Sequence, residues 1–265
     1  MFRSAFFYNA PMPMRVDPAN LELAHLSALA DFSGQRVLEV GTGDGRLAWD
    51  LSPDAALWLA LEPDPAELRA AARALPHMDA PAVRLLAGDG RTLALPAAAL
   101  DVAFFTWSLC CVPPSGMPAA LAEAQRVLRP GGWLVDIHPA ADPLPLSMWT
   151  LRPGAPADSV DPDDFDAEFL GELAPGGMQP NFAAATAALA AAPTLGFTLE
   201  AADQFDFRLF FDDLDELSDH LDENDEYGVP DDDLLEAALL GLQAATRRAC
   251  LVLTQPVLLT RLLRL

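Results

Sequence analysis

The feature that most constrains the fold is an alternation of short apolar runs with helix-like segments in the first half of the chain. The apolar runs, each typical of a buried strand, fall at 37–40, 57–63, 83–89, 100–110 and 133–138. Helical patterns follow or separate them at 45–51, 65–75 and 117–128. Strands that alternate with helices through short connections form a parallel sheet with helices on both faces. The sequence therefore predicts an α/β fold.

The alternation lapses between 139 and 195, a stretch rich in proline, glycine and acidic residues. Because a long irregular stretch in a compact domain is usually functional or disordered, we expect an insertion that acts as a lid. Strand-like patterns return at 197–211 and 251–265, on either side of an acidic, mostly helical segment. The 265 residues fit one domain, in which 1–33 forms an N-terminal cap region.

A glycine-rich stretch joins the first strand to the helix that follows it. Its sequence is Glu39-Val40-Gly41-Thr42-Gly43-Asp44-Gly45, and the three glycines allow a tight turn and a close approach to a ligand. A dinucleotide-binding loop has the pattern G-x-G-x-x-G, but Arg46 stands where that pattern requires the third glycine. Glu39 and Asp44 also place negative charge where a pyrophosphate would lie. The loop therefore suits a ligand with a positive centre.

This stretch resembles the first motif of the class I S-adenosylmethionine-dependent methyltransferases, an acidic residue followed by x-G-x-G-x-G. Further motifs of that family follow in order, in Leu61-Glu62-Pro63-Asp64, Gly88-Asp89-Gly90 and Arg129-Pro130-Gly131-Gly132. The resemblance covers 34–138. It implies a Rossmann-like sheet of seven strands, mostly parallel, with helices on both faces and an antiparallel last strand.

The resemblance also implies S-adenosylmethionine as the cofactor. Glu39 would face its methionine end, Glu62 would accept hydrogen bonds from the ribose hydroxyls, and Asp89 would accept one from the adenine amino group. Tyr8 and Arg15 of the N-terminal cap region would cover the cofactor, with Arg15 on the methionine carboxylate. The other residues expected to bind it are Gly41, Thr42, Gly43, Gly45, Pro63, Gly88, Gly90, Thr106 and Trp107.

The acceptor is expected at the ends of the fourth and fifth strands, because ligands of open α/β sheets bind at the carboxyl ends of strands. Trp107 could wall an acceptor pocket or belong to the core. His138 ends the fifth strand, where it could serve as the base for an acceptor hydroxyl or simply bond to the backbone. The N/D-P-P-Y/F motif of base- and amide-directed members is absent. We expect a small-molecule acceptor, methylated at oxygen or, as second choice, at nitrogen, with His138 as the catalytic base.

The charge balance bears on the class of partner. The chain has 39 acidic against 16 basic residues and a net charge of −23, which repels phosphate backbones and anionic lipid headgroups. We therefore expect neither nucleic acid nor a membrane as partner. No apolar run reaches the roughly 20 residues that span a bilayer, and the N-terminus lacks a secretory pattern, so we expect a cytoplasmic protein. Three cysteines without C-x-x-C spacing, and no histidine cluster, predict no metal site.

Two other classes of function remain open. One is a protein that binds S-adenosylmethionine without turnover. The other is an NAD-dependent oxidoreductase, which the missing third glycine disfavours. A fold alone does not separate these classes from a methyltransferase. The chain is expected to act as a monomer or homodimer.

Overall fold

The computed structural model describes residues 15–159 and 161–265. Contacts divide the chain into two compact units, each assembled from separate segments. Unit 1 takes the residues up to Ala24, Ala140–Pro180 and Phe205–Val257, and unit 2 takes His25–Pro139, Asn181–Gln204 and Leu258–Leu265. Two long strands, β9 (Phe197–Phe211) and β11 (Ala249–Arg264), contribute residues to both units. The expectation of a single domain with a cap region and a lid stays a prediction.

Unit 2 is built on five parallel strands that pair in the order β4-β3-β2-β5-β6. Their bounds are β2 (Arg36–Val40), β3 (Leu57–Glu62), β4 (Val83–Ala87), β5 (Leu100–Thr106) and β6 (Leu128–Pro139). All but one of the side chains of β5 are buried. Such a strand reads as a continuous apolar run because helices cover both faces of its sheet.

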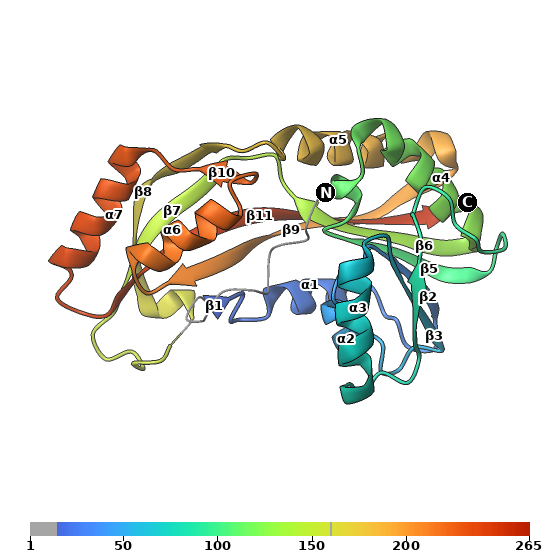
Figure 1. Ribbon diagram of the computed structural model, residues 1–265, viewed down its shortest axis with the longest axis horizontal. Helices are drawn as coiled ribbons and strands as arrows, with labels where there is room; N and C mark the ends of the chain where they lie inside the picture. Colours follow the sequence, from blue (N-terminus) through green and yellow to red (C-terminus); the bar gives the residue numbers. More distant parts are fainter. Residues whose placement is uncertain (1–14, 160) are drawn as a thin grey trace. The chain divides into compact units, whose positions relative to one another are not determined.

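Past β6, the strand order continues to β11, which in turn pairs with β9. The amide of Leu265 donates to the carbonyl of Gly196 at 2.9 Å, and the arrows of these two strands point in opposite directions in Figure 1. The two last strands are therefore antiparallel to each other. With them, unit 2 has the mostly parallel, Rossmann-like α/β fold that the sequence predicts.

Helices lie on both faces of this sheet (Figure 1). The helices in the sequence of unit 2 are α2 (Arg46–Leu51), α3 (Pro65–Ala74), α4 (Met117–Val127) and most of α5 (Gln179–Ala190). The start of α3 shows why the chain turns helical there: the side chain of Asp64 caps the amide of Ala66 at 2.6 Å, and Pro65 occupies the first helical position. Helix α4 buries a stripe at helical spacing, from Met117 to Val127, against the sheet.

The core of unit 2 contains a group of aromatic rings. The ring of Trp58 packs edge-on against Phe32, with centroids 5.3 Å apart, and against Phe104, with centroids 6.3 Å apart. Trp58 and Phe104 are completely buried. This packing surrounds the part of β2 that leads into the glycine-rich loop, so the loop starts from a rigid base.

Unit 1 is an antiparallel sheet with helices. Its strands pair in the order β10-β8-β7-β11, and β9 pairs with β11 and with β1. The bounds are β1 (Arg15–Val16), β7 (Leu144–Leu151), β8 (Phe165–Pro175) and β10 (Gly228–Val229) for the strands, and α6 (Leu214–Glu223) and α7 (Asp232–Ala244) for the helices. Helix α1 (Leu21–Leu29) starts where the carboxylate of Asp17 accepts the amides of Leu21 and Glu22.

The segment 139–195 is not irregular, which corrects the sequence-based expectation. It contains β7, β8 and α5. Strand β8 was hard to recognise because most of its side chains are exposed on both faces, so no clear apolar alternation marks it. The role of this segment as a lid stays a prediction.

Candidate cofactor site

The strand order of unit 2 reverses between β2 and β5. From β2 the chain proceeds to β3 and β4 on one side, whereas β5 and β6 lie on the other. In open α/β sheets, ligands bind outside the carboxyl ends of the strands at such a switch point. The residues that follow Val40 and Thr106, where β2 and β5 end, are therefore the first candidates for a site.

The glycine-rich loop after β2 has a backbone that larger residues rarely adopt. The φ angles are +79° at Gly41, +59° at Gly43 and +92° at Gly45, all in the left-handed region. A Cβ added at Gly41 would collide with the side chain of Ser108, and one added at Gly45 would collide with the ring of Trp49. The loop thus keeps its shape only with glycine at these positions.

Glu62, at the end of β3, ties this loop to the neighbouring strand. Its Oε2 accepts the N–H of Gly43 at 2.8 Å, and its Oε1 accepts the N–H of Asp64 at 2.9 Å. Burial raises the pKa of Glu62, and the two amide hydrogen bonds act in the opposite direction. Each carboxylate oxygen can accept more than one hydrogen bond, so a diol could share the group with these amides. The ribose-binding role of Glu62 stays a prediction.

Glu39 supports the loop from within the sheet. Its side chain is 1% exposed, and its Oε2 accepts hydrogen bonds from Thr42 Oγ1 at 2.8 Å and from Trp58 Nε1 at 2.9 Å. Burial raises the pKa of Glu39 to about 7, although the hydrogen bonds from Trp58 and Thr42 lower it. Glu39 therefore braces Thr42, and its predicted contact with the methionine end of the cofactor stays a prediction.

Asp89 follows β4, and Arg91 occupies much of its carboxylate. Arg91 Nε donates to Oδ1 at 2.9 Å, Nη2 donates to Oδ2 at 2.5 Å, and the backbone N–H donates to Oδ1 at 2.8 Å. These hydrogen bonds from Arg91 lower the pKa of Asp89. An adenine amino group would have to share the carboxylate with a guanidinium that already binds it bidentately. The role of Asp89 as acceptor for the adenine amino group stays a prediction.

The end of β5 carries two unusual residues. Thr106 is buried, and its Oγ1 has no hydrogen-bond partner among residues 15–159 and 161–265. Trp107 has a φ of +54°, a strained conformation for a bulky side chain. The hydroxyl of Ser108 donates to the carbonyl of Val40, which ties this loop to the end of β2. Such strain and an unpartnered hydroxyl are typical of functional sites.

His138 lies with Asp136 on one face of β6. Its Nδ1 is 2.5 Å from Asp136 Oδ1, and its Nε2 is 3.0 Å from Oγ1 of Thr186 in α5. The side chains of His138 and Asp136 are 1% and 0% exposed. The partners are side chains rather than the backbone that the alternative interpretation named. A base must reach the proton that it removes. His138 could therefore act on an acceptor only if its Nε2 gave up the hydrogen bond with Thr186 and bonded to the acceptor instead. The catalytic role stays a prediction.

Comparison with known proteins identifies the central part of the chain. Residues 37–132 match the family described as "Methyltransferase domain". This part of the chain is similar to a methyltransferase domain. The cofactor that this similarity indicates is S-adenosylmethionine, and the matched residues run from the first residues of β2 to the turn within β6.

Curated relatives of this methyltransferase domain match about half of the chain. A protein of Mycobacterium ulcerans, named as a phthiotriol/phenolphthiotriol dimycocerosates methyltransferase, is 34% identical over 135 residues, which are 48% of this chain and 49% of the relative. A ubiquinone/menaquinone biosynthesis C-methyltransferase of Paracoccus denitrificans is 32% identical over 129 residues, 48% of this chain and 51% of the relative. The chain thus spans about half the length of these relatives.

A solved structure extends the likeness of fold beyond the methyltransferase domain. A Bacillus halodurans protein assigned as a methyltransferase has a TM-score of 0.59 at 16% identity, over 92% of this chain and 99% of that one. At this identity the likeness concerns the fold alone. It agrees with the α/β class predicted from the sequence.

The other residues that the sequence predicts to bind the cofactor lie in several parts of the chain. Pro63 is exposed next to Glu62, and Gly88 and Gly90 flank Asp89 after β4. The backbone of Arg15 pairs with Phe210 in unit 1. Tyr8 lies outside the described residues. The roles predicted for all of these residues stay predictions.

Sequence reasoning missed Arg91 and Thr186, the partners of two predicted site residues. The partner of Asp89 lies two positions further along the chain, where the family motif names no residue. The partner of His138 lies 48 positions away, on a helix that was not expected. Within 15–159 and 161–265, no group of three or more His, Cys, Asp and Glu side chains could hold a metal ion. In the same part of the chain, every helix is too short or too polar to cross a bilayer.

Proposed function

We propose that the chain transfers the methyl group of S-adenosylmethionine to a small-molecule acceptor, at oxygen. The observation that carries this proposal is the preset glycine-rich loop at the switch point of the sheet. Glu62 accepts the amide of Gly43, and Glu39 accepts the hydroxyl of Thr42, so the chain's own groups fix the loop. A loop that is already ordered loses little entropy when a ligand binds.

The groups around the loop fit the cofactor by their chemistry. Glu62 offers acceptor capacity for a ribose diol, and the unpartnered Oγ1 of Thr106 is a group that a ligand could satisfy. Burial raises the pKa of Glu39 to about 7, so this carboxyl ionises near neutral pH. Together with Asp44, it favours a cationic ligand over a pyrophosphate. S-adenosylmethionine supplies a methyl group activated by its positively charged sulfur.

The protein would contribute mainly by positioning. Methyl transfer is an in-line displacement, and correct alignment of the reacting groups can supply a large part of the rate enhancement. An acceptor hydroxyl must also lose its proton, for which we retain His138 as the proposed base. That role requires Nε2 to release Thr186, whereas an acceptor that is already ionised needs no base.

Transfer to carbon is a second candidate. One of the relatives is named as a C-methyltransferase, which favours this reaction over transfer to nitrogen. The net charge of −23 supports an acceptor that is not nucleic acid and a site away from anionic membranes. We retain the monomer or homodimer and the cytoplasm as the state and place of action.

The proposal is tested in two steps. Calorimetry with S-adenosylhomocysteine first measures cofactor binding by the wild type and by Gly43→Ala, with Gly177→Ala as the control. Gly177 is a suitable control because an added Cβ there meets nothing within 4 Å. A panel of phenols, alcohols and quinols is then incubated with S-adenosylmethionine, and products that gain one methyl group are assigned by NMR. Binding without turnover on any member would favour the non-catalytic alternative, and absence of binding would refute the proposal.

A further inference from the structure

Strand β8 leaves one of its two edges open over most of its length. On one side it pairs with β7 from Phe165 to Leu173, and on the other side it pairs only with the two residues of β10, at Ala174 and Pro175. No other strand of the described residues pairs with it. In Figure 1, β8 lies beside β7, on the side away from β11. The backbone of 165–173 therefore offers donors and acceptors that a further strand could use.

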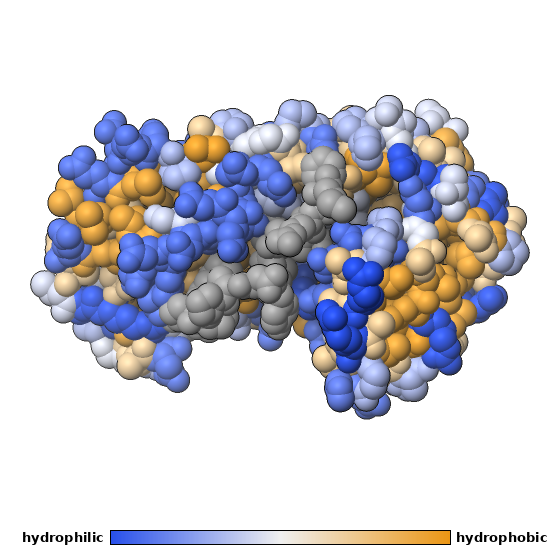
Figure 2. All heavy atoms as spheres, viewed as in Figure 1, coloured by the Kyte–Doolittle hydropathy of each residue, from blue (hydrophilic) through white to orange (hydrophobic). Residues whose placement is uncertain are grey.

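Helix α7 does not close this edge, because it packs on one face of the sheet. A Cβ added at Gly171 of β8 would lie 2.9 Å from the side chain of Leu234, and a Cβ added at Gly241 would lie 2.8 Å from that of Met148 in β7. The helix thus crosses both strands. Figure 2 shows apolar as well as hydrophilic side chains over α7. Residues 166–169 of β8 are all exposed beside it.

The part of the open edge that suits regular pairing is 165–169. Up to Phe169, which pairs with Ser147, β8 follows β7 without interruption. The next pair is Gly171 with Leu146, so Leu170 is an extra residue that forms a bulge. A bulge disrupts the ladder locally, whereas the five residues before it have the usual length of a strand.

The charged residues of this segment and their ionic partners balance each other. Arg152 Nε donates to Asp166 Oδ1 at 2.9 Å, and Arg247 Nη2 lies 3.8 Å from Asp166 Oδ2. Glu168 is exposed two positions further along and points to the same face of the strand. Two arginines thus balance two carboxylates, although the whole chain has a net charge of −23. A second copy can approach here with less repulsion than at an acidic surface.

The charged face of this segment is complementary to itself. The antiparallel register that pairs all five residues of two copies is centred on Ala167, through which a two-fold axis would pass. This register places Glu168 of one copy opposite Asp166 of the other. Arg152 and Arg247, which already bind Asp166, can then share their N–H groups between both carboxylates. A cationic strand of another protein fits less well, because the same two arginines would repel it.

The opposite face of the segment adds apolar contacts in the same register. Phe169 is 62% exposed and would lie opposite Phe165 of the second copy. The ring of Phe165 packs on Trp149, with centroids 5.6 Å apart, so Phe169 would extend an existing aromatic cluster. Ala167 at the axis is small enough to leave room for these rings. Each contact occurs twice because the arrangement is symmetric.

We propose that two copies of this chain associate through residues 165–169 of β8, which pair antiparallel about a two-fold axis. The sheets of two unit 1 regions would then continue into each other. The inference goes beyond methyl transfer and does not rest on it, because every residue that it uses lies in unit 1. Five residues from each copy form a small interface, so the dimer should be weak.

The test measures the mass of the full-length chain by sedimentation equilibrium at roughly 1 to 200 µM, a range that brackets a micromolar Kd. We expect a reversible equilibrium between monomer and dimer. Hydrogen exchange of the amides in 165–169 should slow as the protein concentration rises. A monomer at every concentration, or a dimer with slowed exchange only outside β8, would refute the proposal.

Charge exchange tests the contact between Glu168 and the two arginines. Glu168→Arg should weaken the dimer at least about tenfold, because it places a third cation near Asp166. Arg152→Glu should also weaken it, and the double variant with both changes should recover most of the affinity. Asp79→Arg, at an exposed residue of unit 2, changes the net charge as Glu168→Arg does and serves as the control. Failure of the double variant to recover would overturn the proposed register.

Phe169→Ala tests the apolar face without changing any charge. Because this side chain is exposed, its loss should leave the monomer folded. We expect the dimer to weaken by about threefold or more. Leu240→Ala, at a residue of α7 that is 56% exposed, is the matched control and should leave the Kd unchanged. Equal Kd values for Phe169→Ala and the wild type would contradict the contact with Phe165.

Discussion

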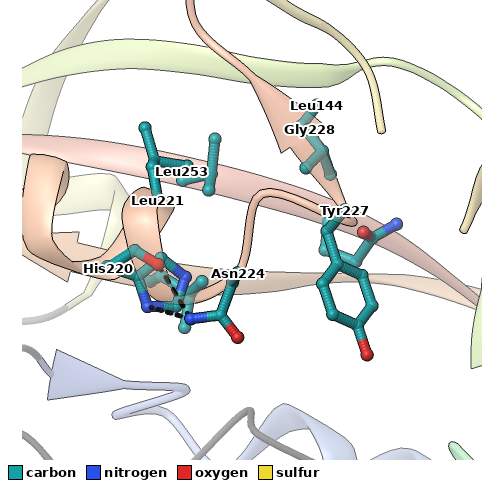
Figure 3. A pocket seen from close by; sticks show the side chains of 9 residues that line it. Leu144, His220, Leu221, Asn224, Tyr227, Gly228 and Leu253 are labelled. Carbon is teal, nitrogen blue, oxygen red and sulfur yellow. Dashed lines mark hydrogen bonds between the residues drawn. The ribbon is translucent and has the colours of Figure 1, made fainter. Parts of the chain in front are cut away.

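The glycine-rich loop of unit 2 and a small pocket of unit 1, lined by Leu144, Leu209, Leu221 and Leu253 together with Asn224 (Figure 3), differ in how their buried polar groups are bonded. In unit 2, the carboxylates of Glu39 and Glu62 accept hydrogen bonds from the chain itself. In unit 1, the buried oxygen of Asn224 is left without a partner among the described residues. The polar groups of the first region are satisfied by the chain's own donors, whereas the second region keeps an acceptor that no described residue satisfies.

The two regions also shift the pKa of a buried group in ways that oppose each other. Burial raises the pKa of Glu39 to about 7 and lowers that of His220 to about 4. In both cases burial shifts the equilibrium toward the neutral form of the group. Burial therefore favours the uncharged form of a carboxyl group in one unit and of an imidazole in the other.

The largest expected effect is a loss of stability, and it should differ between variants of His138 and His220. His138→Ala leaves Asp136 buried without its partner, so we expect the free energy of unfolding to fall by about 3–5 kcal/mol. His220→Ala, which removes a side chain without an ionic partner among the described residues, should cost less. Urea unfolding of both variants checks this. A mild loss of stability in His138→Ala, with a large loss of turnover and an unchanged affinity for S-adenosylhomocysteine, would instead support His138 as the base.

The pH dependence of stability should sharpen the comparison. For Glu39 the folded pKa of about 7 exceeds the ordinary value of 4.5, so its contribution to the stability of the fold falls as the pH rises from 4.5 to 7. For His220 the folded pKa of about 4 lies below 6.5, so its contribution rises between pH 4 and 6.5. Each shift amounts to about 3 kcal/mol.

Single variants should show these opposite pH dependences of stability. Relative to the wild type, Glu39→Gln should gain stability as the pH rises from 4.5 to 7, because glutamine keeps an acceptor for Thr42 and Trp58 but does not ionise. His220→Gln should lose relative stability as the pH rises from 4 to 6.5. Denaturant titrations at several pH values measure both differences. Parallel curves for a variant and the wild type would contradict the shift assigned to that residue.

Gly43→Val should lower the affinity for S-adenosylhomocysteine by at least about 100-fold. The φ of +59° at this residue disfavours a branched side chain, and its amide is the one held by Glu62. Calorimetry measures the affinity, and circular dichroism checks that the variant folds. A folded variant that binds as tightly as the wild type would show that the loop is not the cofactor site.

Glu62→Ala should weaken cofactor binding by about 1–3 kcal/mol, because ribose hydroxyls and the amide of Gly43 lose their acceptor together. Glu62→Gln retains one acceptor oxygen and should lie between the alanine variant and the wild type. Calorimetry at one pH ranks the three proteins. An unchanged dissociation constant in Glu62→Ala would show that Glu62 does not bind the cofactor.

The smallest expected effect concerns Arg91. Arg91→Ala frees the carboxylate of Asp89, so the affinity for S-adenosylhomocysteine should stay the same or rise by less than about fivefold. Stability should hardly change, because exposed ion pairs contribute little. Arg84→Ala, which removes hydrogen bonds to the carbonyls of Pro81 and Val83, is the control. A marked loss of affinity in Arg91→Ala would mean that Arg91 orients Asp89 for the ligand.

Much of unit 2 could be predicted from the sequence because its signals are local. A buried parallel strand such as β5 is a continuous apolar run. Glycine at three alternate positions predicts a loop with left-handed backbone angles. Strand 197–211 was placed with the bounds that the structure has. The family resemblance added the order of the motifs.

The parts that could not be predicted depend on packing between distant segments. Strand β8 exposes most of its side chains and carries little periodic signal. The pocket of unit 1 joins Leu144 of β7 to Leu253 of β11, and no motif links such positions. Asn224, which follows the last residue of α6, also lines this pocket. Side-chain pairing of this kind follows from the tertiary structure and not from any short stretch of sequence.

The sharing of β9 and β11 between the units has a consequence for synthesis on the ribosome. Both units include residues from β11, which is made after every other helix and strand that the structure describes. A chain that emerges from its N-terminus can form the local βα segments early, but it cannot complete either unit until 249–264 have left the exit tunnel. Nascent chains that stall before this point would leave β6 and β7, the two strands between which β11 lies, each with an unpaired edge. The chain should therefore depend on chaperones during translation more than a protein whose domains are sequential.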